Sequence, residues 1–141
     1  MASDTGDFAK SMSIATSGLR AQSGRMRLIS ENIANADSTA LTAGGDPYRR
    51  KISSFTSALD RTLDAKTVSL GRIRNDQSPF RVKNEPGNPA ADAAGNVKYP
   101  NVNPLVEMTD MREAQRSYEA NLNIISATRR MIQRTLDILK A

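Results

Sequence analysis

The sequence predicts a mainly α-helical chain, in which two long terminal helices pack as a coiled coil around an irregular middle with a small β-hairpin. Three observations predict this: a seven-residue apolar repeat at the N-terminal end, a second at the C-terminal end, and Pro- and Gly-rich turns between them. Alternating spacings of three and four residues keep one apolar seam facing a partner helix. We therefore divide the chain into an N-terminal helix (1–38), a middle segment (39–103) and a C-terminal helix (104–141).

The N-terminal helix is expected to begin near Asp7, whose carboxylate suits a helix N-cap, and to end within residues 35–38. Its predicted seam consists of Phe8, Met12, Ala15, Leu19, Gln22, Met26, Ile29 and Ile33. A second apolar row lies one position earlier, at Ile14, Ala21 and Leu28. A stripe of this width is enough to contact more than one neighbouring helix.

The middle segment combines turns with short candidate strands. Residues 39–47 are predicted to form a loop, and residues 48–63 fit either one helical face or an extended chain. Residues 67–74 and 79–83 are strand candidates that together form a plausible hairpin. Residues 90–103 are expected to be extended and irregular.

The C-terminal helix has a clear predicted start, because Asn103 can cap it and Pro104 suits the first helical position. Its predicted seam consists of Met108, Met111, Gln115, Tyr118, Leu122, Ile125, Arg129, Ile132, Leu136 and Leu139. A second apolar row lies one position before the seam, at Ala114, Ile124, Met131 and Ile138. A two-helix hairpin buries only one such face, so we expect other subunits to complete the seams and the isolated chain to be loosely folded.

Three polar residues interrupt these seams: Gln22, Gln115 and Arg129. They fit either partly exposed edges of the seams or positions that fix the register between helices, since a polar group in an apolar seam is tolerated where it finds a partner.

Composition excludes several classes of site. The chain has no Cys and no His, which removes disulfides, thiolate chemistry, the usual zinc sites and the usual general base. No catalytic constellation is apparent, and we predict neither an enzyme nor a bound cofactor or metal. Residues 92–96 faintly resemble a calcium loop but lack its alternating ligands and terminal Glu.

No apolar stretch is long enough for a membrane span, and acidic residues near the N-terminus argue against a secretory signal peptide. The net charge of +5 lies mainly in the middle segment, at residues 49–51 and at Arg72, Arg74, Arg81 and Lys83. These cations fit either a solvated face or a contact with an anionic surface.

Several motifs resemble those of the bacterial flagellar rod and hook proteins, and most closely those of the proximal rod. The N-terminal helix ends in a family-level signature that comprises Asn32, Ile33, Ala34 and Asn35. The more specific pieces are Pro86, Gly87, Asn88 and Pro89, then Pro100, Asn101, Val102 and Asn103, then Arg116, Ser117, Tyr118, Glu119, Ala120 and Asn121. The ordered set spans nearly the whole chain.

The resemblance implies a structural subunit of the periplasmic rod, the drive shaft that joins the rotor to the hook. It implies export in an unfolded state through the flagellar type III apparatus, without a cleaved signal. The implied partners are copies of the chain, other rod proteins and the junction protein between rotor ring and rod. The terminal helices would pack as concentric tubes and the middle would form outer contacts.

Two alternatives remain open. The nearer is a different rod or hook-junction protein, against which the Pro-Gly-Asn-Pro and Pro-Asn-Val-Asn segments argue. The more distant is a basic helical adaptor that binds nucleic acid, for which the middle segment offers cations but no recognisable module.

Overall fold

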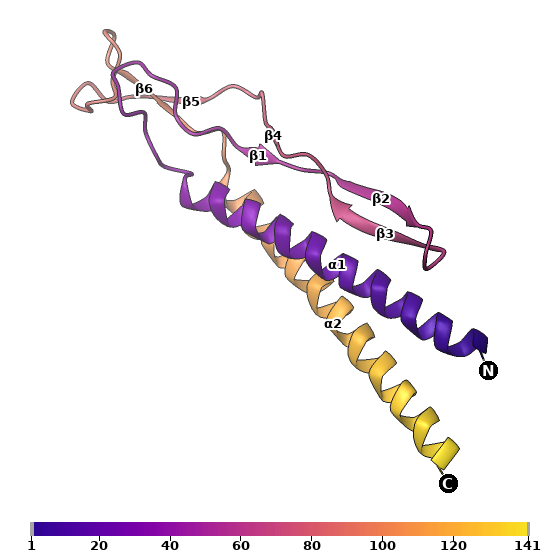
Figure 1. The fold of residues 1–141 in the computed structure, drawn as a ribbon. Coiled ribbons are helices and arrows are strands. Elements are labelled where there is room, and N and C mark those ends of the chain that lie inside the picture. The colour runs from indigo at the N-terminus through magenta and orange to yellow at the C-terminus, as the bar shows by residue number, and fades with distance from the viewer. Residues whose placement is uncertain (1, 141) are drawn as a thin grey trace. The chain divides into compact units, whose positions relative to one another are not determined.

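The computed structural model describes residues 2–140, and Figure 1 shows their fold. Two long helices, α1 (Ala2–Ala34) and α2 (Pro104–Lys140), lie at the two ends of the chain. Six short strands lie between them in the sequence. The predicted class of two terminal helices around a small β middle is confirmed. Among the described residues, no helix combines the length and the apolar character that crossing a membrane requires.

The six strands form three separate antiparallel pairs. β1 (Lys51–Ile52) pairs with β4 (Arg74–Asn75), β2 (Phe55–Asp60) with β3 (Ala65–Leu70), and β5 (Arg81–Asn84) with β6 (Asn96–Tyr99). The β2–β3 hairpin is closed by a turn in which Asp64 has a positive φ of 47°. Asp60 starts that turn by accepting the backbone N–H of Thr62 at 2.9 Å.

The predicted hairpin between residues 67–74 and 79–83 is wrong in its pairing. Both segments contain strands, but β3 pairs with the preceding β2, and β5 pairs with β6, inside the stretch expected to be irregular. Residues 48–63 form strands and a turn, so the extended alternative for this segment is the one observed. The apolar residues of this segment are spaced as on one helical face, but they lie in its strands and in the turn that follows them.

The helix ends follow the expected chemistry with one correction. α1 begins at Ala2, so Asp7 lies inside the helix and does not cap it. The helix does end before residues 35–38, where turn hydrogen bonds take over from the helical pattern. At the start of α2, the Asn103 side chain accepts the backbone N–H of Leu105 at 3.1 Å, which confirms the predicted cap.

The chain divides into two compact units, and each contains part of both helices. The first, here called the helical unit, comprises Met1–Met26, Ser54–Gly71 and Glu113–Ala141, as far as these residues are described. The second, here called the polar unit, comprises Arg27–Ser53 and Arg72–Arg112. Contacts within each unit therefore join segments that are distant in the sequence.

Candidate assembly surfaces and their internal support

The polar unit is organised around the side chain of Asn32, which is only 1% exposed. Its Nδ2 donates to the Lys51 carbonyl at 2.9 Å and to Glu107 Oε2 at 3.1 Å. Its Oδ1 accepts from the Lys51 N–H and from the Tyr48 hydroxyl, both at 2.9 Å. All four hydrogen-bonding positions of the amide are used, so this residue of the family signature fixes α1 to β1 and to the start of α2.

Glu107 is the charged centre of the same network. Its side chain is 1% exposed, and its Oε1 lies 2.6 Å from the Nε of Arg50. Arg50 also lies 3.6 Å from Asp76 and 3.7 Å from Asp110. Burial lowers the Arg50 pKa, but the hydrogen bond and charge of Glu107, together with the charges of Asp76 and Asp110, raise it overall.

A second Asn of the family motifs, Asn101, fixes the backbone of the middle segment. Its Oδ1 accepts the Arg50 N–H at 2.8 Å, and its Nδ2 donates to the Asp76 carbonyl at 3.0 Å. The same Nδ2 also lies 2.9 Å from the Ser78 hydroxyl. We call the residues Asn32, Tyr48, Arg50, Asp76, Asn101 and Glu107 the polar clamp.

The neighbouring motif residues have similar local roles. Arg81 donates to the Pro100 carbonyl at 3.0 Å and to the Ala36 carbonyl at 2.8 Å, which fixes the end of α1. Val102 is buried at the entry to α2. Asn88 accepts the Ala90 N–H at 3.0 Å and organises the turn that contains Pro86, Gly87 and Pro89.

Sequence reasoning missed most of the polar clamp. It places Arg50 in a cationic run and links it to no acidic residue, yet its side chain pairs with that of Glu107. They are 57 residues apart in the chain, and no local pattern links positions at that separation. The cations of residues 49–51 are therefore largely internal, while Arg72, Arg74 and Lys83 are exposed.

In the helical unit, small residues allow α1 to approach the other elements closely. Ala15 and Ala21 are each 2% exposed, and a Cβ added at Gly18 would lie 2.7 Å from the Asn121 side chain. Asn121 belongs to a family motif, so that motif supplies the α2 side of a close helix contact. Figure 1 shows the two helices side by side here, with β3 beside α1.

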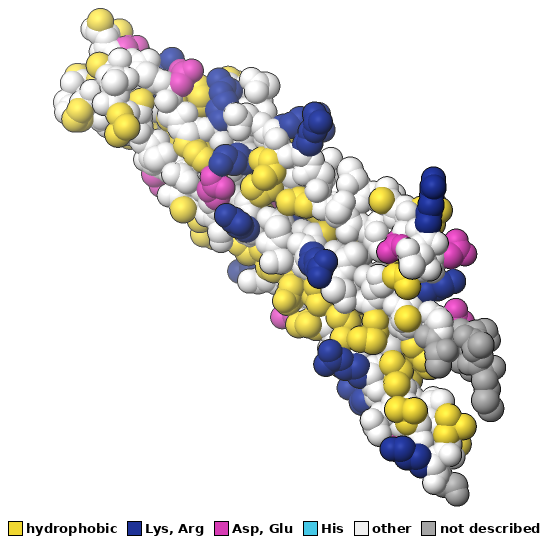
Figure 2. All heavy atoms as spheres, viewed as in Figure 1, with side chains coloured by type: hydrophobic (Ala, Val, Ile, Leu, Met, Phe, Trp, Pro, Cys, Tyr) yellow, Lys and Arg dark blue, Asp and Glu magenta, His cyan; other side chains and the backbone are white. Residues whose placement is uncertain are grey.

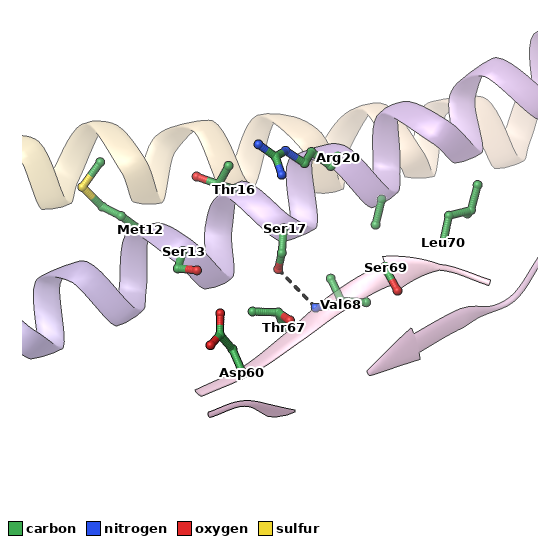
Figure 3. Close-up of a pocket in the computed structure, with 11 residues that line it drawn as sticks. Met12, Ser13, Thr16, Ser17, Arg20, Asp60, Thr67, Val68, Ser69 and Leu70 are labelled. Atoms are coloured by element: carbon green, nitrogen blue, oxygen red, sulfur yellow. Dashed lines mark hydrogen bonds between the residues drawn. The ribbon is translucent and has the colours of Figure 1, made fainter. Parts of the chain in front are cut away.

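The β2–β3 hairpin is fixed to α1 by the hydroxyl of Ser17. This oxygen donates to the Ile14 carbonyl at 2.7 Å and accepts the Val68 N–H at 3.2 Å. Figure 3 shows the adjoining hollow, which has a volume of about 550 Å³ and is lined mainly by polar side chains. Met12, Arg20 and Asp60 are among the residues around it.

The face of α2 that packs inside the helical unit differs from the predicted seam at alternate positions. The buried and half-buried residues along this face are Ala114, Tyr118, Asn121, Ile125, Thr128 and Ile132, and Ser117 and Ala127 beside it are half-buried as well. Tyr118, Ile125 and Ile132 belong to the predicted seam, but the other three positions of the face each precede a predicted one by one residue. The cause is the close contact of α1 with α2, which small side chains permit and which turns the larger ones outward.

Two exposed ridges consequently flank the packed face of α2, one of mixed character and one apolar. The first contains Leu122 and Leu136 along with Gln115 and Arg129, all four exposed. The second contains Ile124, Met131 and Ile138, which are 48%, 52% and 77% exposed. Figure 2 shows hydrophobic side chains on the surface of this part of the chain.

The other predicted seam residues lie as follows. Phe8, Met12, Leu19, Met26 and Ile33 of α1 are half-buried, and Ile29 is buried. In α2, Met111 is half-buried, while Met108 and Leu139 are exposed. An apolar groove of about 300 Å³ lies among Phe8, Ala9, Met12, Ile132, Thr135, Leu136 and Leu139.

Gln115 and Arg129 lie at exposed positions, and the structure does not pair either with another helix. Gln22 differs, because its Oε1 is buried and has no hydrogen-bond partner among the described residues. Among the side chains that the structure describes, no group of three or more acidic residues is placed to hold a metal ion. The Asp92 side chain instead accepts the backbone N–H groups of Ala94 and Asn96 in a turn.

Comparison with known proteins gives matches at both ends and along the whole chain. Residues 12–40 match the family model described as flagella basal body rod protein, and residues 93–138 match the model described as flagellar basal body rod FlgEFG protein C-terminal. A flagellar basal-body rod protein FlgC of Agrobacterium fabrum is 54% identical over 91% of this chain and 92% of its own length. Proteins of the same name from Bacillus subtilis and Salmonella typhimurium are each 38% identical, over 92% and 89% of this chain and 97% and 92% of their own lengths.

Proposed function

This chain belongs to the FlgC family of flagellar basal-body rod proteins, and we propose that it polymerises through the outward faces of its terminal helices to form the proximal rod. It is a structural subunit of the basal-body rod. The observation that carries the proposal is the exposed apolar side chains on both sides of the packed face of α2: Ile124, Met131 and Ile138 on one ridge, and Leu122 and Leu136 on the other.

Exposed apolar side chains of this kind call for neighbours. A helix that buries one stripe needs one partner, whereas a helix that is apolar on both flanks of its packed stripe gains free energy from a partner on each side. The three exposed residues Ile124, Met131 and Ile138 follow one another at intervals of seven, as a continuous helix contact requires. Helices that pack against neighbours on several sides can form tubes in which each subunit contacts several others.

Stiffness is the mechanical requirement of a drive shaft that transmits torque. Close-packed interiors resist deformation, so each helix in such a shaft must be surrounded by packed side chains. In this proposal, the exposed ridges of α2 pack against neighbouring subunits. Within the chain, the close approach of α1 to α2 at Gly18 and Asn121 supplies the packing. The polar clamp would hold the middle segment, as the outer contact region, at a fixed position on the ends of both helices.

The proposed partners follow from this role. They are copies of the chain, other rod proteins, the junction protein between rotor ring and rod, and the flagellar type III export apparatus during secretion. The proposed site of assembly is the periplasmic part of the basal body. Assembly of this kind requires no catalysis, no cofactor and no nucleic acid.

The test is the pair of variants Leu122→Asp and Asn123→Asp. Both add a negative charge to the same turn of α2 at exposed positions, but only Leu122 is an apolar residue of a ridge. We expect Leu122→Asp to abolish rod assembly, because a charge buried between subunits costs several kcal/mol. Asn123→Asp should assemble normally.

The measurement is electron microscopy of basal bodies from a strain that lacks the chromosomal gene and expresses each variant, together with detection of the exported chain. Export should be equal for both variants. Complete rods built from the Leu122→Asp variant would overturn the proposal. The circular dichroism spectra of the two purified variants should agree, because neither position is packed within the chain.

A further inference from the structure

The β2–β3 hairpin leaves one edge of β2 open, and the strand register identifies the groups on that edge. Ser57 pairs with Val68, and the Val68 N–H points away from β2 to the Ser17 hydroxyl. Ser57 and Val68 therefore form a non-hydrogen-bonded pair, in which the backbone groups of both residues point away from each other. By alternation, the N–H and C=O groups of Phe55, Ser57 and Leu59 face outward from β2.

This edge lacks the usual protection against pairing. Residues 55–59 of β2 are all exposed, and the only charged residue of the strand is Asp60 at its end. There is no Pro, Lys or bulge in β2, which are the devices that natural edge strands use to prevent association. Within the described residues, no hydrogen bond from outside the hairpin reaches the outward backbone groups of β2.

The edge is also self-complementary. Phe55 and Leu59 lie two positions on either side of Ser57, and both are apolar and exposed, by 41% and 56%. In an antiparallel pair of two β2 strands centred on Ser57, each Phe55 would lie opposite the Leu59 of the other copy. Cross-strand pairs of an aromatic and an aliphatic residue are stabilising by roughly 0.2–1 kcal/mol each.

We propose that two copies of the chain associate through the outward edges of β2, in a two-fold symmetric pair centred on Ser57. The four strands then form one antiparallel sheet in the order β3, β2, β2 of the second copy, and β3 of the second copy. The outward groups of Phe55, Ser57 and Leu59 in the two copies meet, which gives about six backbone hydrogen bonds.

Three features favour a second copy over an unrelated extended peptide. The apolar residues are placed symmetrically about the centre of the strand, as only a two-fold partner needs. The single charge of β2, Asp60, would lie opposite Ser54 of the other copy, so no like charges meet. A shift of one residue would set inward-facing backbone groups against outward-facing ones, so that register is disfavoured.

This association is closed, because a two-fold contact uses the same surface on both copies. It is therefore distinct from the open-ended helix packing proposed for the rod, and of the two tests below only the second relies on that proposal. Chains that are not yet part of the polymer would therefore associate as dimers and no further through this contact.

The first test uses the absence of Cys from the natural sequence. In the full-length Ser57→Cys variant the two thiols would lie directly opposite each other, with Cα atoms about 5.5 Å apart, within the range that a disulfide spans. The control is Lys66→Cys, an exposed position on β3 that does not lie at the contact. Under mild oxidation, non-reducing electrophoresis should show a covalent dimer for Ser57→Cys at least tenfold faster than for Lys66→Cys.

The second test compares Ser57→Pro with Ser57→Val by analytical ultracentrifugation, both in the Leu122→Asp background, which suppresses helix-mediated association. Proline removes only an outward N–H and leaves the β2–β3 hydrogen bonds intact, whereas valine keeps that donor. We expect a dimer for Ser57→Val and a monomer for Ser57→Pro, with equal circular dichroism spectra. Equal cross-linking at both cysteine positions, or the same mass for the proline and valine variants, would overturn the proposal.

Discussion

The two compact units of the chain are stabilised by different kinds of interaction. The comparison distinguishes interactions that fix the geometry within a subunit from surfaces that are available to neighbouring subunits. In the polar unit, buried Asn32 and Glu107 have their polar atoms paired with groups of the same chain. In the helical unit, packing depends on small and apolar side chains, and apolar residues such as Met131 and Ile138 remain exposed, as Leu41 and Leu105 do in the polar unit. Internal polar pairing is specific in direction, so it fixes geometry, whereas exposed apolar area supplies free energy for association.

The largest effect should come from breaking the polar clamp at its charge. We expect Glu107→Ala to lower the free energy of unfolding by roughly 3 kcal/mol, because the half-buried Arg50 and the buried Asn32 amide each lose a partner. The matched control is Glu113→Ala, an acidic residue of the same helix that is 67% exposed and lies 3.6 Å from Arg25. That change should cost less than about 1 kcal/mol.

Urea unfolding followed by circular dichroism measures both values. Glu107→Gln separates charge from hydrogen bonding and should fall between the two. Equal losses for Glu107→Ala and Glu113→Ala would contradict the division of the chain into a polar unit that fixes geometry and a helical unit that does not.

A smaller effect is expected at the open end of the β2–β3 hairpin, opposite its turn. The Gly71 N–H donates to the Ser54 carbonyl at 2.7 Å, and a Cβ at residue 71 would lie 2.7 Å from that same oxygen. Because the obstacle is backbone, Gly71→Ala must lengthen this hydrogen bond, at a cost of about 1–3 kcal/mol. Gly6→Ala is the control, since nothing lies within 4 Å of its added Cβ and alanine favours the helix.

Thermal unfolding should therefore show Gly71→Ala below the natural chain and Gly6→Ala at or slightly above it. Amide exchange of β2 should increase in Gly71→Ala alone. If amides of the polar clamp exchanged faster to the same extent as those of β2, the hairpin would not behave as a local element of the helical unit.

The sequence predicted both helices and the cap of α2, because those features depend on residues close together in the chain, whereas the cap predicted for α1 at Asp7 was wrong. The start of α2 at Pro104 after the Asn103 cap is an example. The pairing of β5 with β6 was not predicted, because it depends on strands separated by a long turn whose closure no local pattern encodes. The family motifs include Asn32 and Asn101, but they do not indicate what these side chains contact.

The α2 seam shows why periodicity alone assigns a face imprecisely. Hydrophobicity favoured Leu122 as the inward residue, whereas the close approach at Gly18 selects the neighbouring Asn121. Packing distance therefore decided between two positions that differ by one residue. The larger side chain was left outside, where a monomer gains little from it.

A pH effect should distinguish the units further. The Asp76 pKa is lowered chiefly by the hydrogen bond from the Ser78 backbone N–H, and Arg50 lowers it as well. The Glu85 pKa is lowered by the hydrogen bond from Asn88 and then by that from Tyr99. A carboxyl whose folded pKa is depressed contributes stability that is present above its unfolded pKa, near 4, and is lost as the pH falls through the folded value.

We therefore expect the free energy of unfolding to fall between about pH 5 and pH 2, with the loss located in the polar unit. Urea unfolding at a series of pH values measures it, and Asp76→Asn should make the acid dependence shallower. A dependence unchanged in Asp76→Asn would remove this carboxyl from the contributing groups. Asp64→Asn, in the exposed turn of the helical unit, serves as the control.

The smallest effect is expected at alkaline pH, from the phenol of Tyr48. Burial raises the pKa of Tyr48 to about 12, and the negative charges of Glu31 and Glu107 add to the shift. Since the folded pKa lies above the unfolded value near 10, the contribution of this group is complete below pH 10 and is lost as the pH rises through about 12. Ultraviolet titration of the phenols should show one tyrosine that ionises near pH 12 and is absent in Tyr48→Phe, with Tyr118→Phe as the control. Ionisation of Tyr48 near pH 10 in the folded chain would mean that the hydroxyl does not lie in the polar clamp as a donor to Asn32, and the contrast between the two units would then depend on Glu107 alone.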